Sequence, residues 1–426
     1  MTGTLAGNSE MRDRPVGSEV VTAAPLLTLR DGAPAVVETA GQLRTAAAAL
    51  AAGTGPVAVD AERASGHRYG QRAYLVQLRR AGAGTALVDP VRCPHLEELA
   101  DAIAGAEWVL HAASQDLPCL AELGLRPGTI FDTELAGRLA GHPRVGLGAM
   151  VESVLGYRLE KSHSAADWSL RPLPESWLRY AALDVEVLVE LRNALEAELE
   201  GQGKLDYARQ EFAAVVAAPP AAPRPDPWRR TAGIHRVRNR RQLAAVRELW
   251  GARDALARRR DVAPTRVLPD AALIAAALAD PTDAKALFSL ASFGGRGTRR
   301  HVGTWLAALE SARSLPESAW PPLAGPRGAV PTTNRWAERE PAAAARLAGV
   351  RAALAALAET HRIPTENLLA PEVVRQLAWS PPTPADRASV ATALQSHGAR
   401  SWQVQLALVT VTDALAVAGR STPAAD

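Results

Sequence analysis

Four acidic residues and one tyrosine stand at spacings that suit metal-dependent chemistry. Asp60 and Glu62 lie two positions apart at the end of the apolar run Pro56–Val59. If this run is a strand, both side chains point to the same face of a sheet. Two carboxylates placed in this way repel each other unless a cation lies between them, and hard divalent cations prefer such oxygen ligands. The pair indicates a candidate cation site, although acids at a strand end also turn simply to solvent.

The other candidates follow later in the chain. Asp116 comes after the apolar stretch Trp108–His111, across a short turn, and Tyr180 and Asp184 are four residues apart. A spacing of four puts a phenol and a carboxylate on one helix face. Each feature alone has an ordinary explanation: an acid in a first helical turn stabilises the helix, and an acid on a helix commonly pairs with arginine. Their occurrence together and in this order favours one shared site.

Alternating apolar residues predict the sheet that must carry the first acids. Three short strands over Pro56–Arg63, Ala73–Leu78 and Thr85–Asp89, joined by glycine-containing links, indicate a meander, and a fourth strand is expected over Glu107–Ala112. Strands mixed with helices in this way are typical of an α/β domain with mixed strand directions. Helices are expected over 33–53 with a start near Glu38 or Thr39, 95–104, 115–123, 132–140, 147–155, 174 to about 200, and 202–216.

Length and charge divide the chain. Its 426 residues exceed what one hydrophobic core usually serves, so we expect two or three domains. The net charge of +3 is unevenly spread: residues 1–223 hold 20 Lys+Arg and 28 Asp+Glu (−8), residues 224–313 hold 18 and 8 (+10), and residues 314–426 hold 10 and 9 (+1). The basic segment indicates a surface that attracts phosphates, and the acidic segment one that needs cations. The alternative is a merely well-solvated helical surface.

Several classes of protein are disfavoured. No run approaches the roughly 18 consecutive apolar residues of a membrane span, and the N-terminus lacks a basic region followed by an apolar core, so we expect a cytoplasmic protein without membrane contact. No G-x-x-x-x-G-K-[ST] phosphate loop is present, which counts against a helicase role. Cys93 and Cys119 have no Cys or His at ligand spacing and are expected to be buried thiols.

A weak internal duplication lies in the C-terminal half. Ala263-Pro264-Thr265 and Ile363-Pro364-Thr365 each follow an Arg- and Ala-rich amphipathic pattern and precede a short helical pattern. Self-similarity of this kind favours two copies of one small helical domain. The proline-rich stretches 217–227 and 315–332 are the expected linkers.

The acidic set and the tyrosine resemble the DEDD exonuclease superfamily, in its tyrosine-bearing branch. The likeness extends to Ala73–Leu78 after the first motif, to His111–Leu117 around the second, and to Lys161–Leu173 leading into the third. The last run is similar to ribonuclease D in particular, and the resemblance covers roughly residues 35–215. One departure is visible: ribonuclease D usually has an aromatic residue directly after the first motif, where this chain has Arg63.

The resemblance implies a ribonuclease H-like mixed-sheet fold and a site for two Mg²⁺ or Mn²⁺ ions. By this likeness, Asp60 bridges the ions, Glu62 and Asp184 bind one, Asp116 completes the other partly through water, and Tyr180 orients the attacking water. Such ion pairs stabilise both the attacking and the leaving oxygen of an in-line displacement at phosphorus. The expected products are nucleoside 5′-monophosphates released from a 3′ end.

Residues 235–313 resemble the helicase-and-ribonuclease-D C-terminal domain, abbreviated HRDC, which binds nucleic acid in that family. A second copy is expected near 336–418, where the near-neutral charge favours packing over binding. Lys161, Arg171 and Arg179 can contact phosphates or be plain surface charges, and His111 can be a cleft residue or a packed structural one. The candidates for contact with nucleic acid are Gln77, His111, Lys161, Arg171, Arg258, Arg259, Arg260, Arg296, Arg299 and Arg300.

The sequence therefore predicts an α/β exonuclease domain followed by two all-α bundles. The expected activity is that of a 3′-to-5′ exoribonuclease acting on structured RNA such as transfer RNA precursors. The alternatives are a DNA 3′-to-5′ exonuclease of the Werner-helicase type and a catalytically inactive RNA-binding protein, and the intact acidic set counts against the second. The predicted layout is a disordered tail (1–30), the exonuclease domain (31–216), a linker (217–234), an HRDC domain (235–315), a linker (316–332), a second HRDC-like domain (333–420) and a tail (421–426).

Overall fold

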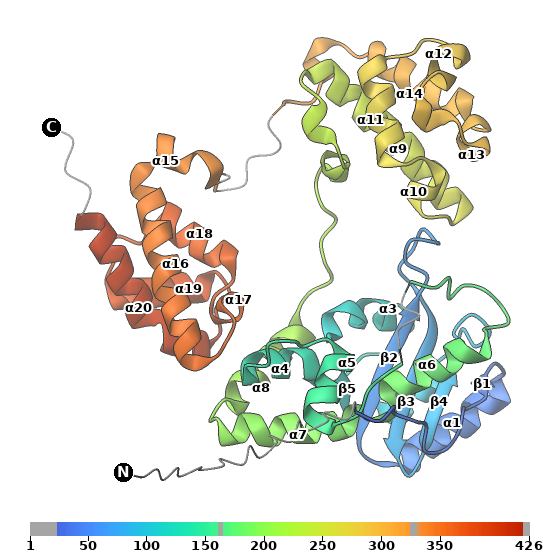
Figure 1. Cartoon of the computed structure of the whole chain (residues 1–426), viewed down its shortest axis with the longest axis vertical. Helices are drawn as coiled ribbons and strands as arrows, with labels where there is room; N and C mark the ends of the chain where they lie inside the picture. Colours follow the sequence, from blue (N-terminus) through green and yellow to red (C-terminus); the bar gives the residue numbers. More distant parts are fainter. Residues whose placement is uncertain (1–23, 161–164, 324–329, 332, 421–426) are drawn as a thin grey trace, which may run out of the picture.

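The computed structural model describes residues 24–160, 165–323, 330–331 and 333–420. Figure 1 shows an α/β domain, built from the N-terminal half of the chain, and two separate helical bundles. The mixed α/β plus all-α architecture predicted from the sequence is confirmed.

A six-stranded mixed sheet forms the centre of the α/β domain. Its strand order is β1-β4-β3-β2-β5-β6, with β2, β3 and β4 antiparallel and the pairs β2–β5, β5–β6 and β1–β4 parallel. The predicted meander is therefore present, and two further strands that the sequence did not predict, β1 and β6, widen the sheet. The strands are β1 (Val36–Val37), β2 (Thr54–Arg63), β3 (Ala73–Ala81), β4 (Gly84–Val88), β5 (Glu107–Leu110) and β6 (Thr129–Asp132).

Helices cover both faces of this sheet. Thr39 caps the first helix through a reciprocal capping box with Gln42, which agrees with the helix start predicted near Glu38 or Thr39. The long helix predicted from 174 to about 200 is broken at Val187, whose φ of −124° is not helical. The helices of this domain are α1 (Ala40–Ala52), α2 (Glu97–Ile103), α3 (Leu117–Glu122), α4 (Thr133–Ala140), α5 (Leu147–Met150), α6 (Glu175–Glu186), α7 (Leu188–Gly201) and α8 (Leu205–Ala217), with short turns η1 (Ala113–Gln115) and η2 (Val151–Leu155).

Strand β2 lies inside the sheet and is buried on both faces. Val57 and Val59 point into the main core with α1 and α2, whereas Ala58 packs with Val185 and Leu188 from α6 and α7 on the opposite face. A strand enclosed in this way must be apolar along most of its length. The acids at its end are therefore held at the border of a dry interior.

Residues 24–30 do not form the disordered tail that was predicted for residues 1–30. Within 24–30, Leu27 is buried in the main core and its backbone N–H donates to the carbonyl of Arg158. Arg30 forms an ion pair with Glu190 at 2.5 Å. An apolar anchor and a paired guanidinium hold this segment against the domain, so the prediction of a tail up to residue 30 was wrong for residues 24–30.

The two helical bundles have separate cores. Trp305, Phe293 and Leu249 are buried in the first, and Trp336, Val350 and Leu377 in the second. The helices of the first bundle are α9 (Arg240–Arg260), α10 (Pro264–Val267), α11 (Asp270–Ala279), α12 (Ala284–Phe288), α13 (Arg296–Arg299) and α14 (Val302–Arg313). Those of the second are α15 (Trp336–Arg339), α16 (Pro341–His361), α17 (Thr365–Leu368), α18 (Pro371–Trp379), α19 (Arg387–Ser396) and α20 (Ser401–Arg420). Short turns are η3 (Pro227–Arg230), η4 (Ile234–Arg236), η5 (Ala291–Phe293), η6 (Glu317–Ala319) and η7 (Thr333–Arg335).

The duplication predicted from the two Pro-Thr motifs is visible in both bundles. Helices α9 and α16 each have 21 residues and each ends at a left-handed residue, Asp261 (φ 46°) and Arg362 (φ 50°). A four-residue helix follows in both cases, and then a longer one, α11 or α18. The repeated motif therefore marks the same helix-to-helix turn twice.

Helix α16 is long and apolar enough to cross a membrane by length and composition. In the structure, Leu347, Val350 and Leu354 on this helix are buried in the core of the second bundle. This environment is that of a central bundle helix.

The first bundle contacts the loop 64–72, which follows β2 directly. The Tyr69 hydroxyl donates to Asp254 at 2.9 Å and accepts from Arg258 at 3.0 Å. The Ala263 N–H donates to the carbonyl of His67 at 3.0 Å. The loop that leaves the first two acids is therefore tied to the end of α9, as Figure 1 shows at the tip of the β2–β3 hairpin.

The second bundle contacts the α/β domain at another place, around α4 and α8. The Lys204 ammonium donates to the carbonyls of Leu139 at 2.8 Å and His361 at 2.7 Å. The Trp402 indole donates to Glu211 at 2.9 Å and stacks on Tyr207. The α/β domain thus carries one bundle at the loop 64–72 and the other at α4 and α8.

Candidate active site

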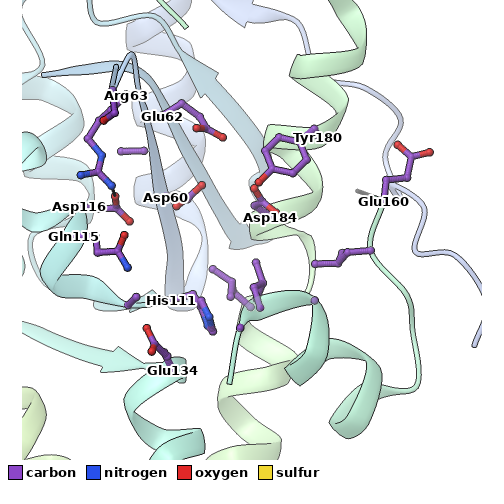
Figure 2. Close-up of a pocket in the computed structure, with 18 residues that line it drawn as sticks. Asp60, Glu62, Arg63, His111, Gln115, Asp116, Glu134, Glu160, Tyr180 and Asp184 are labelled. Carbon is purple, nitrogen blue, oxygen red and sulfur yellow. Dashed lines mark ion pairs between the residues drawn. The ribbon is translucent and has the colours of Figure 1, made fainter. Parts of the chain in front are cut away.

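Three carboxylates meet where the end of β2 faces α6. Side-chain oxygens of Asp60, Glu62 and Asp184 lie within 4.8 Å of one another. Figure 2 shows Asp60 and Glu62 pointing from the strand toward the helix that carries Asp184. The i, i+2 spacing on β2 and the packing of α6 over β2 bring the three acids together, as the sequence predicted.

Asp116 approaches from the other side of the strand end, at the junction of η1 and α3. It is buried and shares a side-chain hydrogen bond with Asp60. Its Oδ1 also lies 3.3 Å from Nη2 of Arg63, the last residue of β2. All four predicted acids therefore belong to one cluster.

Tyr180 stands one helical turn before Asp184 on α6. Its phenol is hydrogen-bonded to the Asp184 carboxylate, and the ring packs beside Trp168 with centroids 6.5 Å apart. Burial, with the negative charges of Asp184 and Glu62, raises the pKa of Tyr180 above its ordinary value. The phenol is protonated at neutral pH and acts as a donor within the site.

The electrostatics of the cluster favour a cation. Burial and the neighbouring carboxylates raise the pKa of Glu62 to about 9 and that of Asp116 to about 8. Burial likewise raises the pKa of Asp60 and of Asp184. Acids that resist ionisation next to one another release this strain when divalent cations bind between them. A donor set of four carboxylates fits hard oxygen-seeking ions such as Mg²⁺ and Mn²⁺.

The acids line one wall of a cavity of about 690 Å³. Figure 2 shows Gln115, His111 and Glu134 below the acidic cluster and Glu160 on the opposite side. The cavity is large enough for a nucleotide-sized ligand. Its lining is formed by Asp60, Ala61, Glu62, Arg63, Ser65, His111, Ala112, Gln115, Asp116, Glu134, Gly146, Leu147, Gly148, Leu159, Glu160, Tyr180, Asp184 and Leu188.

A buried residue that the sequence did not single out positions Asp116. Asp132 accepts hydrogen bonds from the N–H groups of Ala112 at 3.0 Å and Ala113 at 2.8 Å, and it caps α4 through Leu135 and Glu134. Ala112 has a left-handed φ of 61°, which a non-glycine residue adopts only when its surroundings hold it. Asp132 therefore fixes the turn that delivers Asp116. In the sequence, Asp132 could have been recognised as a helix N-cap, because it stands between Phe131 and Thr133 at the start of a helical pattern.

Two residues predicted to contact nucleic acid do not line the cavity. Arg171 forms a two-bond ion pair with the fully buried Asp89, and its remaining N–H groups donate to three backbone carbonyls. Its five donors are thus saturated. Gln77 pairs with Asp60 in the strand register but is completely buried and does not line the cavity. The structure contradicts both predictions, because Arg171 has no free donor and Gln77 is completely buried.

His111 lines the cavity but offers no positive charge. Its Nδ1 lies 2.9 Å from the Thr133 hydroxyl, and it is also hydrogen-bonded to the backbone of Val145. Burial lowers the pKa of His111 to about 4, so the ring is neutral. Arg179 is exposed on α6 outside the cavity lining, and Lys161 lies outside the described residues.

The basic candidates on the first bundle gather at the end of α9. Arg258 is engaged with Tyr69 and Asp254, so it serves the contact between the domains. Four exposed arginines lie near His301 in space or in sequence: Arg259, Arg260, Arg299 and Arg300. Arg260 lies 3.2 Å from the His301 ring. We call Arg259, Arg260, Arg299 and Arg300 the basic cluster. Arg296 lies on α13, and its side chain is outside what the structure describes.

Sequence comparisons agree with the order of these parts. Residues 34–200 match the family described as 3'-5' exonuclease, residues 242–309 match the HRDC domain, and residues 329–415 match the 3' to 5' exonuclease C-terminal domain. Ribonuclease D of Gluconacetobacter diazotrophicus is 32% identical over 335 residues, covering 76% of this chain and 81% of that protein. Ribonuclease D of Escherichia coli K12 is 31% identical over 331 residues, covering 75% and 84%.

Solved structures show the same arrangement of domains. A crystal structure of a protein from Bifidobacterium adolescentis has a TM-score of 0.84 and 39% identity, covering 92% of this chain and 100% of that one. Escherichia coli RNase D, described as an exoribonuclease involved in structured RNA processing, has a TM-score of 0.67 and 27% identity, covering 90% and 98%.

The mixed sheet, the acidic cluster and the exonuclease match define a nuclease of the 3′-to-5′ exonuclease class. Identity above 30% over four fifths of the length of a full ribonuclease D makes the assignment more specific. The chain belongs to the ribonuclease D family.

Neutralising one acid should stabilise the metal-free protein. Because the folded-state pKa values are raised, the fold is destabilised as pH rises from the ordinary carboxylate range through about 8 for Asp116 and about 9 for Glu62. We therefore expect Asp60→Asn to raise the melting temperature in EDTA at pH 8, by about 2–4 °C per kcal/mol of relieved repulsion, and to have a smaller effect at pH 5. Thermal unfolding at both pH values tests this, and a variant that melts lower than the wild type at pH 8 contradicts it.

Loss of the Asp132 anchor should impair the site through Asp116. In Asp132→Asn, the two backbone donors of the 112–113 turn share fewer acceptor oxygens, so we expect a loss of about 1.5–3 kcal/mol of stability and at least a tenfold lower kcat. Asp386→Asn, at the exposed N-cap of α19, is the matched control and should keep full activity. The expectation fails if Asp132→Asn binds Mn²⁺ and cleaves substrate as the wild type does.

Proposed function

We propose that this protein is a 3′-to-5′ exoribonuclease that removes nucleoside 5′-monophosphates by two-metal-ion hydrolysis. The observation that carries the proposal is the cluster of four buried carboxylates and one tyrosine on a single cavity, in a chain of the ribonuclease D family. The similarity to ribonuclease D proteins supports RNA as the substrate. The Escherichia coli relative, which is involved in structured RNA processing, supports structured RNA, and we propose transfer RNA precursors as the substrate class.

The side chains divide the work according to position. Glu62 and Asp184 face each other across one half of the cluster, Asp116 lies in the other half, and Asp60 lies between them. Bound divalent ions would acidify a water and stabilise the charge that develops on the phosphate. Asp60 would contact both ions, and the other acids would hold one side each.

Tyr180 would orient the attacking water. Its protonated phenol sits on the cavity wall, fixed by Asp184 and by the ring of Trp168. The water would lose a proton as its oxygen forms a bond to phosphorus, the bond between phosphorus and the 3′ oxygen would break, and that oxygen would take up a proton as the new 3′ hydroxyl. Since a phenol with a raised pKa stays protonated at neutral pH, Tyr180 cannot take up the proton of the water and serves as a positioning donor.

The basic cluster offers a path for the rest of the RNA. The cluster lies near the end of α9. The same end of α9 contacts Tyr69, which belongs to the loop that leaves the catalytic strand. Arginines that neutralise phosphates release counterions, which gives affinity without sequence preference. A strand held there would have its 3′ end close to the cavity.

The first test is digestion of 5′-labelled RNA and of matched DNA with Mn²⁺. We expect a ladder that shortens one nucleotide at a time, loss of cleavage with Asp184→Asn or EDTA, and a kcat about 10²–10³ lower with Tyr180→Phe at unchanged Mn²⁺ affinity. Tyr157→Phe, an exposed tyrosine, is the control. Faster cleavage of DNA would instead support a DNA exonuclease, and RNA binding without cleavage would support an inactive RNA-binding protein.

Removal of two charges from the basic cluster should weaken binding without changing the chemistry. For the double variant Arg259→Gln and Arg300→Gln, we expect a higher KM for long RNA, an unchanged kcat, and a salt dependence of binding that is shallower by about 1.4 in the slope of log K against log salt. The exposed pair Arg44→Gln and Arg209→Gln, on α1 and α8, provides the comparison. An unchanged slope would place the RNA on another surface.

A further inference from the structure

Arg63 is the residue of the cavity that family membership does not explain. It ends β2 next to Glu62, at a point where the register with β3 shifts. Its side chain is about one quarter exposed, lines the cavity, and reaches across to Asp116 with Nη2 at 3.3 Å from Oδ1. The permanently charged guanidinium of Arg63 is therefore paired with Asp116, one of the proposed ion-binding acids.

Arg63 is also the one cationic side chain among the described residues that line the cavity. His111, the other basic residue type in the lining, is neutral because burial lowers its pKa to about 4. Any contact between the cavity wall and a phosphate through a charged side chain would fall to Arg63. The nearby Arg68 does not line the cavity, and its Nε donates to the hydroxyl of Ser169 at 2.7 Å.

We propose that Arg63 is a substrate-binding residue that exchanges Asp116 for the phosphate of the terminal nucleotides when the acidic cluster is filled by divalent cations. This inference rests on the proposed function. The guanidinium and a cation compete for the same Asp116 oxygen, so occupation of the cluster frees the guanidinium. Its planar fork of donors matches the geometry of a phosphate.

The charges of the site support this exchange. Four carboxylates carry a charge of −4 and two divalent ions +4, so the filled cluster is neutral without Arg63. With Arg63 the filled cluster has a charge of +1, which attracts the single negative charge of a phosphodiester. Of the two other acids that line the cavity, Glu134 is paired with Arg138, and Glu160 lies outside the cluster. In the absence of cations, Arg63 instead offsets part of the repulsion among the acids, and its charge opposes the rise in pKa at Asp60, Glu62 and Asp116.

The two roles predict opposite effects of one substitution. By linkage, a residue that competes with cations must be displaced before they bind, so its removal tightens their binding. Since a charge-assisted hydrogen bond is lost on the substrate side, we expect Arg63→Gln to bind Mn²⁺ roughly tenfold more tightly and to raise the KM for RNA roughly tenfold, with kcat changed less than fivefold. Arg63→Lys should recover part of the KM while keeping a single point charge.

The experiment is calorimetric titration of Mn²⁺ into the full-length protein without RNA, followed by steady-state cleavage of a short RNA. Wild type, Arg63→Gln, Arg63→Lys and the control Arg72→Gln are compared, since Arg72 is exposed on the same hairpin outside the cavity. Tighter Mn²⁺ binding together with a raised KM in Arg63→Gln alone supports the proposal. Mn²⁺ affinity that is unchanged or weaker, or a KM that is unchanged, overturns it.

Failure of this proposal is separable from failure of the proposed function. If the wild type does not cleave RNA at all, the function is wrong whatever Arg63 does. If the wild type cleaves and Arg63→Gln matches Arg72→Gln in both measurements, only the role of Arg63 is wrong. A melting temperature for each variant, measured in EDTA, shows whether Arg63→Gln is folded, and Arg63→Lys supplies the comparison if it is not.

Discussion

Four carboxylic acids are held close together in a partly dry cavity, and the rest of the structure depends on this constraint. Asp60 and Glu62 cannot move apart because β2 is buried on both faces, and Asp184 cannot retreat because α6 packs over the same strand. Burial is the largest cause of the raised pKa values at all four acids, and repulsion from neighbouring carboxylates adds to it at Glu62, Asp116 and Asp184. A fold that holds acids in such proximity gives up stability in order to bind cations in a fixed geometry.

Other parts of the chain extend this arrangement outward. Asp132 fixes the turn that presents Asp116, and the loop 64–72 continues from the catalytic strand to the first helical bundle. The second bundle is attached at α4 and α8 through Lys204 and Trp402. The two copies of the helical bundle therefore have different surroundings: the first contacts the loop that leaves the catalytic strand, and the second contacts α4 and α8.

Local periodicity predicted which acids share a face, but not which of them belong to a site. Strand periodicity puts Asp60 and Glu62 on one face and helix periodicity does so for Tyr180 and Asp184, whereas their joint occurrence in the order of a known exonuclease superfamily singled them out. Arg171 was misjudged because its partner, Asp89, is 82 residues away in the sequence. Gln77 was misjudged because alternation indicates the face of a strand and not the depth of burial. β6 was missed because its four residues run directly into the cap of α4.

The central claim is that these four acids form one site for two divalent ions. The most direct measurement is anomalous diffraction from crystals grown with Mn²⁺, in wild type and in Asp60→Asn. The account predicts two ions about 3.5–4 Å apart in the wild type, one bound by Glu62 and Asp184, the other on the Asp116 side, and Asp60 between them. It also predicts loss of at least one ion in the variant. A cluster without manganese at saturating concentration, or the same two ions in Asp60→Asn, would contradict it.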